Sequence, residues 1–143
     1  MSFLSSFNIT GSGLTAQRLR MDVISQNIAN ARVTRTESGG PYRRKMVVLS
    51  SIESESGSFS SAFKKAAAGG VQVDQILEDS SEPVPTYEPD HPDANEEGYV
   101  MYPNVNTAQE MIDMLGASRA YEANITAFNA VKTMALKALE IGR

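Results

Sequence analysis

The residues with the clearest potential for chemistry surround the single histidine of the chain. His91 lies in the run Asp90-His91-Pro92-Asp93, and three further carboxylates flank this run: Glu88, Glu96 and Glu97. Carboxylate oxygens and an imidazole nitrogen are ligands for divalent cations. Two prolines interrupt the segment, however, and it lacks the glycine-ordered spacing of a calcium loop. We therefore predict an ordinary acidic loop without a metal, and we keep a metal-dependent hydrolase centred on His91 as an alternative.

Other catalytic and cofactor sites are disfavoured by the residue types present. Gly11-Ser12-Gly13 precedes a predicted helix, but it lacks the G-x-x-x-x-G-K-[ST] pattern and the preceding strand of a phosphate-binding loop. A Ser-His-Asp triad would have to use His91, and nothing in the sequence selects a serine for it. Cysteine is absent, which excludes thiolate metal sites and disulfides. We therefore predict a protein that is not an enzyme and binds no cofactor.

The overall composition is typical of one soluble domain. The 143 residues are 41% hydrophobic and 21% charged, a balance that allows a single core. No stretch reaches the roughly eighteen apolar residues of a membrane span. The segment Met1-Ser2-Phe3-Leu4 lacks the basic and apolar regions of a cleaved secretory signal, so any export is expected to use another route.

Charge is strongly segmented along the chain. Residues 1–65 hold nine Lys and Arg and four acids, residues 66–118 hold eleven acids and no base, and residues 119–143 hold four bases and two acids. We expect opposite ends of one subunit to carry opposite sign, which would favour head-to-tail contacts; the alternative is a solvated acidic face. The basic portion is too short and too rich in serine to indicate nucleic-acid binding.

The last thirty-seven residues predict the longest element of the fold. Thr107 and Glu110 form a T-x-x-E capping box, and no proline follows before Gly142, which is placed to end the helix. Such a helix spans roughly 50 Å. A compact chain of this length has a diameter of only about 35–40 Å. The helix is therefore expected to protrude and to belong to a subunit of an assembly, rather than to lie buried in its own core.

Two adjacent apolar seams run along this predicted helix. The first follows the alternating three-and-four spacing of a coiled coil: Met111, Met114, Ser118, Tyr121, Ile125, Phe128, Lys132, Ala135 and Leu139. The second lies beside it: Ala117, Ala120, Asn124, Ala127, Val131, Met134, Ala138 and Ile141. One neighbour needs only one seam, so two seams predict packing between several helices.

A second amphipathic helix is predicted near the start of the chain, over residues 12–31. Phe7, Leu14, Met21 and Ile28 recur every seven residues. Residues 3–10 extend this helix only if Gly11 and Gly13 are tolerated, since glycine costs about 1 kcal/mol inside a helix. Two asparagines, Asn27 in this helix and Asn124 in the last one, are candidates for fixing the register of helix pairing.

The middle of the chain predicts a small β-rich module over residues 34–104. Strands are expected over residues 42–52, from Val71 to Leu77 and over residues 99–102, with prolines breaking the stretches between them. Residues 50–61 contain seven serines and predict a mobile loop. The predicted fold class is therefore α+β, in which a helix over residues 1–33 pairs with a helix over residues 105–143 as an extended coiled coil.

Both terminal segments resemble the bacterial flagellar axial proteins, which include the rod and hook proteins. Residues 25–34, Ser-Gln-Asn-Ile-Ala-Asn-Ala-Arg-Val-Thr, resemble the asparagine-rich element that ends the first helix of that family. The C-terminal resemblance rests on Pro103-Asn104-Val105-Asn106, Glu110-Met111, the segment 118–124 and the segment 138–143. The chain length and the final Ile141-Gly142-Arg143 favour a protein of the proximal rod over the longer distal rod and hook proteins.

This resemblance implies a structural subunit of the basal-body proximal rod. Such a subunit would be exported unfolded through the flagellar type III apparatus and would assemble with itself and other rod proteins. The product is the tubular shaft that crosses the periplasm, transmits torque and encloses the export channel. It would use no cofactor, metal, nucleic acid or small-molecule substrate. A coiled-coil adaptor or needle-type component of a related secretion system, forming defined dimers or trimers, is the alternative.

The helix seams supply the residues expected at subunit interfaces. They are Leu14, Met21, Asn27, Ile28, Asn30, Met111, Met114, Tyr121, Asn124, Ile125, Phe128, Val131, Met134 and Leu139.

Overall fold

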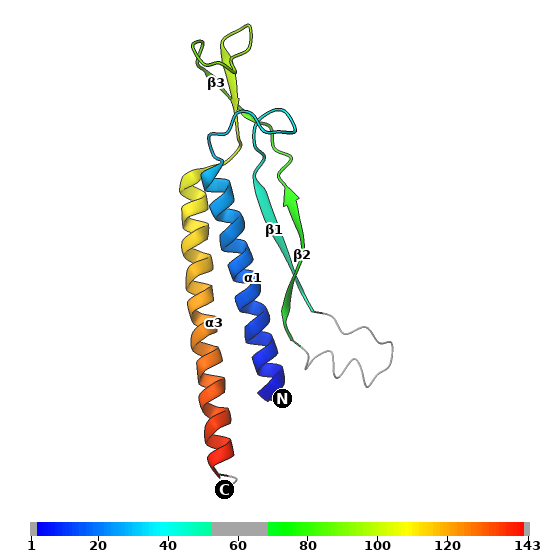
Figure 1. Ribbon diagram of the computed structural model, residues 1–143, viewed down its shortest axis with the longest axis vertical. Coiled ribbons are helices and arrows are strands. Elements are labelled where there is room, and N and C mark those ends of the chain that lie inside the picture. The colour runs from blue at the N-terminus through cyan, green and yellow to red at the C-terminus, as the bar shows by residue number, and fades with distance from the viewer. Residues whose placement is uncertain (1–2, 53–68, 142–143) are drawn as a thin grey trace, which may run out of the picture.

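The chain forms an elongated α+β structure in which two long helices lie side by side, one small hairpin lies alongside them and a second lies beyond their end (Figure 1). The computed structural model describes residues 3–52 and 69–141. The elements in chain order are α1 (Phe3–Ala29), β1 (Lys45–Ser51), β2 (Val71–Glu78), β3 (Val84–Tyr87), β4 (Tyr99–Tyr102) and α3 (Thr107–Ile141). The predicted α+β class is confirmed. Within the described ranges, neither helix contains a stretch long and apolar enough to cross a bilayer.

Helix α1 begins at Phe3, so the predicted start at Ser12 is wrong and the conditional extension over residues 3–10 is observed, with both glycines inside the helix. The reason is packing against α3. The ring of Phe7 lies edge to face on Phe128, with centroids 5.0 Å apart. A Cβ at Gly13 would lie 3.1 Å from the side-chain oxygen of Asn124, so the missing side chain allows the two helices to approach closely. These contacts offset the helix propensity lost at glycine, which is about 1 kcal/mol per residue.

The cap of α3 differs from the predicted capping box. Asn106 precedes the helix, and its side-chain oxygen accepts hydrogen bonds from the backbone N–H groups of Ala108 and Gln109, at 3.1 and 3.2 Å. The N-cap is therefore Asn106 and not Thr107, in keeping with the strength of asparagine as a cap. The Glu110 side chain does not turn back to the helix start, because it is bonded to Asn27 of α1 and to Arg44 just before β1.

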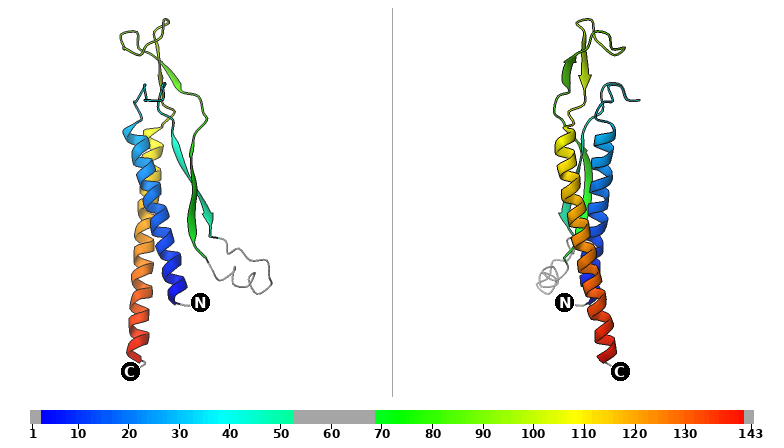
Figure 2. Two further views of the ribbon diagram at one scale, coloured as in Figure 1. Left: turned by 45° about the vertical axis from the view of Figure 1, so that its right-hand side comes forward. Right: turned by 90° about the vertical axis from the view of Figure 1, so that its left-hand side faces the viewer.

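Helix α3 is the longer of the pair and extends past the start of α1 (Figure 2). Its 35 residues span roughly 52 Å, as predicted from the sequence. The two helices run antiparallel, and Phe7 lies opposite Phe128. The four described residues before Phe7 therefore reach only to about residue 132 of α3. The rest of α3 has no part of α1 beside it. Gly142, the predicted end, lies outside the described residues.

One row of α3 faces α1, and it lies between the two predicted seams. The buried and half-buried positions with alternating three-and-four spacing are Met114, Ala117, Tyr121, Asn124, Phe128, Val131 and Ala135, with Asp113, Ser118 and Ala120 beside them. Alternate members come from the first and the second predicted seam. Ala117 is completely buried. The remaining large apolar members of each seam lie on the two flanks of this row and are exposed.

The first hairpin lies along α1, so that α1 is between α3 and the hairpin (Figures 1 and 2). Strands β1 and β2 pair antiparallel from Lys45 opposite Glu78 to Ser51 opposite Val71. The register shifts once, at Asp74, whose carboxylate accepts a hydrogen bond from the Ser50 hydroxyl at 2.7 Å. The first two predicted strands are confirmed. Ser50 and Ser51 belong to β1 and not to a mobile loop, and residues 53–61 of that predicted loop lie outside the described residues.

The second hairpin contains one strand that the sequence analysis missed. Strand β3 pairs antiparallel with β4, and Pro85 lies opposite Met101 in the register. We expected the prolines to exclude a strand here. A two-stranded hairpin has an outer edge where proline costs no ladder hydrogen bond, which explains why β3 forms. The third predicted strand, now β4, is confirmed, and its Val100 is completely buried.

Charge is less separated in space than along the chain. The antiparallel fold brings basic residues of the first third next to acids of the middle: Arg35 lies 4.0 Å from Asp93, and Arg44 lies 3.9 Å from Asp79. The prediction that basic and acidic segments occupy opposite ends is therefore wrong for these pairs. The two segments meet near the second hairpin at Arg35 and Asp93, and next to the start of β1 at Arg44 and Asp79.

The contact at Gly13 gives a first testable prediction. Gly13→Leu should lower the free energy of unfolding by about 1–3 kcal/mol, because the added side chain overlaps Asn124. A Cβ at Gly11 would meet no atom within 4 Å, so Gly11→Leu is the matched control and should raise stability by up to about 0.8 kcal/mol through helix propensity. Urea unfolding followed by circular dichroism measures both changes. Equal midpoints for the two variants would contradict the close helix contact.

Candidate functional site

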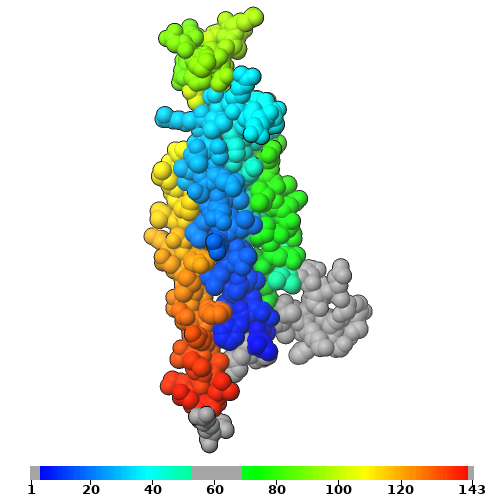
Figure 3. Space-filling model, viewed as in Figure 1, coloured from blue at the N-terminus to red at the C-terminus, as the bar shows by residue number. Residues whose placement is uncertain are grey.

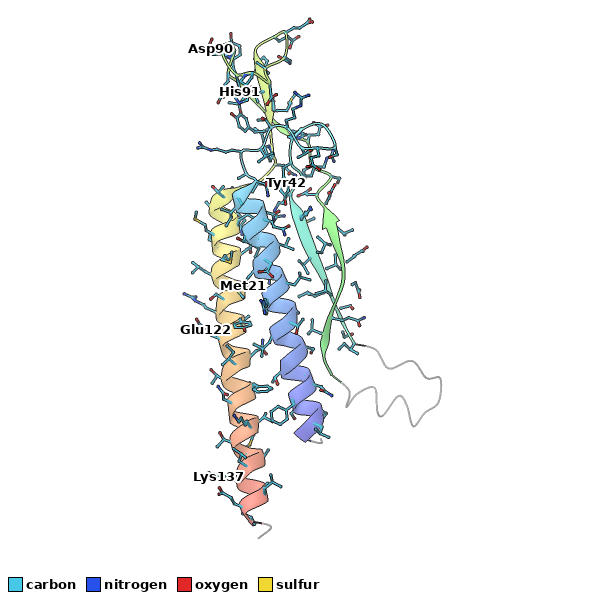
Figure 4. The ribbon with its side chains drawn as sticks, in the orientation of Figure 1. Met21, Tyr42, Asp90, His91, Glu122 and Lys137 are labelled. Carbon is cyan, nitrogen blue, oxygen red and sulfur yellow. The ribbon has the colours of Figure 1, made fainter. Side chains whose placement is uncertain are left out.

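The acidic loop around His91 forms local structure rather than a metal centre. The His91 Nδ1 atom accepts a hydrogen bond from the backbone N–H of Asp93 at 3.1 Å, and the imidazole ring lies edge to face on Tyr102. Asp93 accepts a hydrogen bond from the Thr34 hydroxyl at 2.8 Å. Figure 4 places Asp90 and His91 at the end of the molecule beyond the helices. Across residues 3–52 and 69–141, no group of three His, Asp or Glu side chains is arranged to hold a metal ion.

The most constrained polar group of the described chain is the Asn27 side chain, which is 1% exposed. Its Nδ2 donates to the backbone oxygen of Lys45 and to a carboxylate oxygen of Glu110, each at 2.9 Å. Its Oδ1 accepts from the Tyr42 hydroxyl and from the Lys45 backbone N–H, each at 2.9 Å. An amide has two donors and two acceptor lone pairs, so every hydrogen-bonding position of Asn27 is used. The four bonds join α1 to α3 and to the start of β1.

Glu110 brings a carboxylate into the same place and pairs it with Arg44. The side chain of Glu110 is 1% exposed, and its second oxygen lies 2.7 Å from Arg44 Nε. Arg44 also lies 3.9 Å from Asp79 and from Asp113, and its backbone is hydrogen-bonded to Asp79 and Asn104. A buried carboxylate is tolerated only where charge and hydrogen bonds replace water. We call Asn27, Tyr42, Arg44 and Glu110 the polar junction.

The Tyr42 hydroxyl is kept protonated by its position in the polar junction. Burial is the largest cause that raises the pKa of Tyr42 above its ordinary value of 10.0, and the Glu78 and Glu110 carboxylates add to it. The raised pKa means that the folded state favours the neutral hydroxyl, which donates to Asn27. The resulting stability is fully present below the ordinary pKa and is lost only as the pH rises through the raised value.

The structure distributes the predicted interface residues among three environments. Asn27 belongs to the polar junction, whereas the Asn30 side chain makes only a local bond, from Nδ2 to the Gln26 backbone oxygen at 2.8 Å. The half-buried positions are Leu14, Met21 and Ile28 on α1 and Met114, Tyr121, Asn124, Phe128 and Val131 on α3. The exposed positions are Met111, Ile125, Met134 and Leu139.

Three members of the polar junction were not predicted from the sequence. Glu110 was interpreted as a capping partner, and Tyr42 and Arg44 as residues of the predicted strand over residues 42–52. One signal in the sequence was the spacing of Glu110 from Met114 and Ala117, which places a carboxylate on the apolar row of α3. A charge in an apolar row requires a partner, but only the folded chain shows which one.

Comparison with known families defines the class of this protein. Residues 7–35 match the family model described as "Flagella basal body rod protein". Residues 96–141 match the model described as "Flagellar basal body rod FlgEFG protein C-terminal". The matched segments cover most of α1 and all of α3. The two helices, which carry Asn27 and Glu110 of the polar junction, thus define the class as that of a flagellar basal-body rod protein.

Relatives that align along the whole chain narrow this class. The flagellar basal-body rod protein FlgC of Bacillus subtilis is 48% identical over all of both chains, and that of Escherichia coli O6:H1 is 41% identical, also over all of both. FlgC of Borreliella burgdorferi is 46% identical over 99% of this chain and 98% of its own. The chain belongs to the FlgC family. It is a structural subunit of the flagellar rod in the basal body, which confirms the family and the role expected from the sequence.

Removing the amide of Asn27 tests the polar junction. Asn27→Ala leaves the Glu110 carboxylate and the Lys45 backbone N–H with fewer partners in a dry site, so the free energy of unfolding should fall by about 2–4 kcal/mol. Asn30→Ala removes only a local bond near the end of the same helix and should cost less than about 1 kcal/mol. Chemical unfolding of the two full-length variants compares them. A loss at Asn27 no larger than that at Asn30 would show that the junction contributes little.

Proposed function

We propose that this subunit polymerises, with other rod proteins and with itself, through the exposed flanks of its helix pair. The product is the tubular shaft that crosses the periplasm, transmits torque and encloses the export channel. Membership of the FlgC family supports a place in this shaft, and the surface of α3 supports the mode of assembly. The heptad-spaced row from Met114 to Ala135 is the basis for describing the helix pair as a coiled coil.

The observation that carries the proposal is the unpartnered apolar surface of α3. One flank of the row that faces α1 contains Met111, Ile125 and Leu139, and the other contains Met134 and Ile141. Leu139 is 73% exposed and Ile141 is 87% exposed. Monomeric proteins rarely leave a long apolar surface in water. Each flank has the spacing to receive a helix of an adjacent subunit, so one subunit contacts neighbours on two sides.

The proposal includes delivery without enzymatic activity. We infer that the chain travels unfolded through the flagellar type III export apparatus, without a cleaved signal peptide, and orders its helices on the growing rod. The resemblance of both terminal segments to the axial proteins supports this route. The absence of cysteine is compatible with it, because no disulfide has to form after export. The subunit contributes contacts and not catalysis to the shaft.

Two substitutions on α3 separate folding from assembly. Ile125 is exposed on a flank, so Ile125→Asp should leave the unfolding midpoint of the isolated chain nearly unchanged and abolish motility by placing a charge in a dry contact. Tyr121 is half-buried on the row that faces α1, so Tyr121→Asp should lower the stability of the isolated chain as well. Asn129→Asp is the control for the added charge, because Asn129 is exposed on the side of α3 away from α1 and is not among the large apolar residues of either flank.

Swimming assays and recovery of the variant in purified basal bodies provide the readouts. Wild-type motility of Ile125→Asp would reject the flank as an interface. Defined dimers or trimers of the wild-type chain in solution, with no incorporation into basal bodies, would favour an adaptor or needle-type component instead.

His91→Ala tests the absence of metal-dependent catalysis. The His91 side chain contacts the Asp93 backbone and the Tyr102 ring, which are local interactions of the loop and the hairpin, so its removal should leave rod assembly and motility unchanged. Motility is measured before and after addition of a chelator, in wild type and variant. A severe loss of motility in the variant would restore the metal-dependent alternative.

A further inference from the structure

Methionine supplies all the sulfur of this chain, because the sequence contains seven methionines and no cysteine. A thioether is therefore the side chain that a peroxide oxidises most readily here, and the product is a sulfoxide. Met21 on α1 (Figure 4) and Met114 on α3 are half-buried. The methionines of the described residues that are exposed are Met46, Met101, Met111 and Met134.

Met111 and Met134 differ from the other exposed methionines because they lie on the flanks of α3. Met111 shares its flank with Ile125, and Met134 shares the other flank with Ile141, so each proposed contact surface carries a thioether. Met111 is 56% exposed and Met134 is 55% exposed. Figure 3 shows the outer side of α3 uncovered from its first turns, in yellow, to its last, in red. A small oxidant in water therefore reaches both side chains in the isolated subunit.

Oxidation changes the polarity of these side chains more than their size. One oxygen atom passes from the peroxide to the sulfur, which is oxidised by two electrons, while hydrogen peroxide is reduced to water. The sulfoxide oxygen accepts hydrogen bonds, and burial of such a group without a donor costs free energy. A flank that carries a sulfoxide therefore fits a dry helix contact less well than a flank that carries a thioether.

The fold of the subunit does not depend on these two thioethers. Both lie outside the row of α3 that faces α1, so a sulfoxide at either position leaves the helix pair in place. Met114 belongs to that row and is half-buried, so it should react more slowly than Met111, and its oxidation should weaken the helix pair. Oxidation of the flanks thus separates assembly from folding.

We propose that Met111 and Met134 are modification sites whose oxidation by a peroxide prevents a free subunit from joining the rod. The inference rests on the proposed assembly through the flanks of α3 and adds a regulation to it. Both residues are accessible before assembly and are covered by neighbouring subunits afterwards, so an incorporated subunit is protected. Methionine sulfoxide reductases reverse the reaction, so the exclusion lasts only while the sulfoxide persists.

A glutamine double variant tests the effect of polarity without an oxidant. Glutamine approximates the size and polarity of methionine sulfoxide, so Met111→Gln with Met134→Gln imitates the oxidised subunit. This variant should keep the unfolding midpoint of the wild-type chain, and its recovery in purified basal bodies should fall by about tenfold or more. Met46→Gln with Met101→Gln, exposed positions outside α3, is the matched control and should be recovered like the wild type. Equal recovery of the two double variants would overturn the inference.

Peroxide footprinting tests the reaction on the natural chain. The isolated full-length chain and purified basal bodies are treated with hydrogen peroxide, and peptide mass spectrometry quantifies the sulfoxide at each methionine. Met111 and Met134 should oxidise about tenfold more slowly in basal bodies than in the isolated chain, because neighbouring subunits cover them. Equal rates in the two preparations would contradict the protection that the inference requires.

Competition inside one cell removes the effect of peroxide on other proteins. Cells make both the wild-type chain and a chain with Met111→Leu and Met134→Leu, which lacks the thioethers and keeps the flanks apolar. A peroxide pulse during flagellar growth should raise the share of the leucine chain in new basal bodies by about threefold over the untreated culture. An unchanged share would overturn the inference and leave the rod function intact. Failure of the wild-type chain to enter basal bodies without peroxide would instead reject the proposed function.

Discussion

The structure depends on one constraint: the carboxylate of Glu110 is buried. Glu110 lies in the first turn of α3 with 1% of its side chain exposed, so its charge must be met by groups of the chain itself. Arg44 supplies the opposite charge from the segment before β1, and Asn27 supplies a donor from the end of α1. Neither helix can slide along the other without breaking this set. The position of the first hairpin follows, because Arg44 and Lys45 lead directly into β1.

The rest of the helix pair is held by a different physical force, which explains why it was harder to align from sequence. Apolar burial has no direction, and α3 offers apolar residues over a face wider than α1 can cover. The sequence therefore showed two equally plausible seams. The structure selects the boundary between them, where Gly13 and Ala117 leave room for close approach. The large apolar residues that remain on the flanks are the surface that an assembly can use.

Local signals predicted much of the fold, and long-range contacts decided the rest. The extent of α3, strands β1, β2 and β4 and the α+β class follow from periodicity and turn residues near each element. The start of α1 could not be predicted, because Phe7 and Gly13 are stabilised by residues more than a hundred positions away. Strand β3 was not predicted, because Pro85 is tolerated only at the free edge of a hairpin, and the sequence alone does not show that this edge is free. The polar junction escaped prediction because its members are separated by up to 83 residues.

The overhang of α3 is a short segment that is held at one end only. The polar junction fixes the helix pair near the start of α3, and the last turns of α3 lie beyond any support from α1. The packing of α1 reaches only to about residue 132, so about nine residues of α3, or roughly 13 Å, have no support from α1. A bend of about five degrees where that support ends moves the free end of α3 by about 1 Å. A neighbouring surface that packs on these last turns can therefore move them while the rest of the subunit keeps its fold.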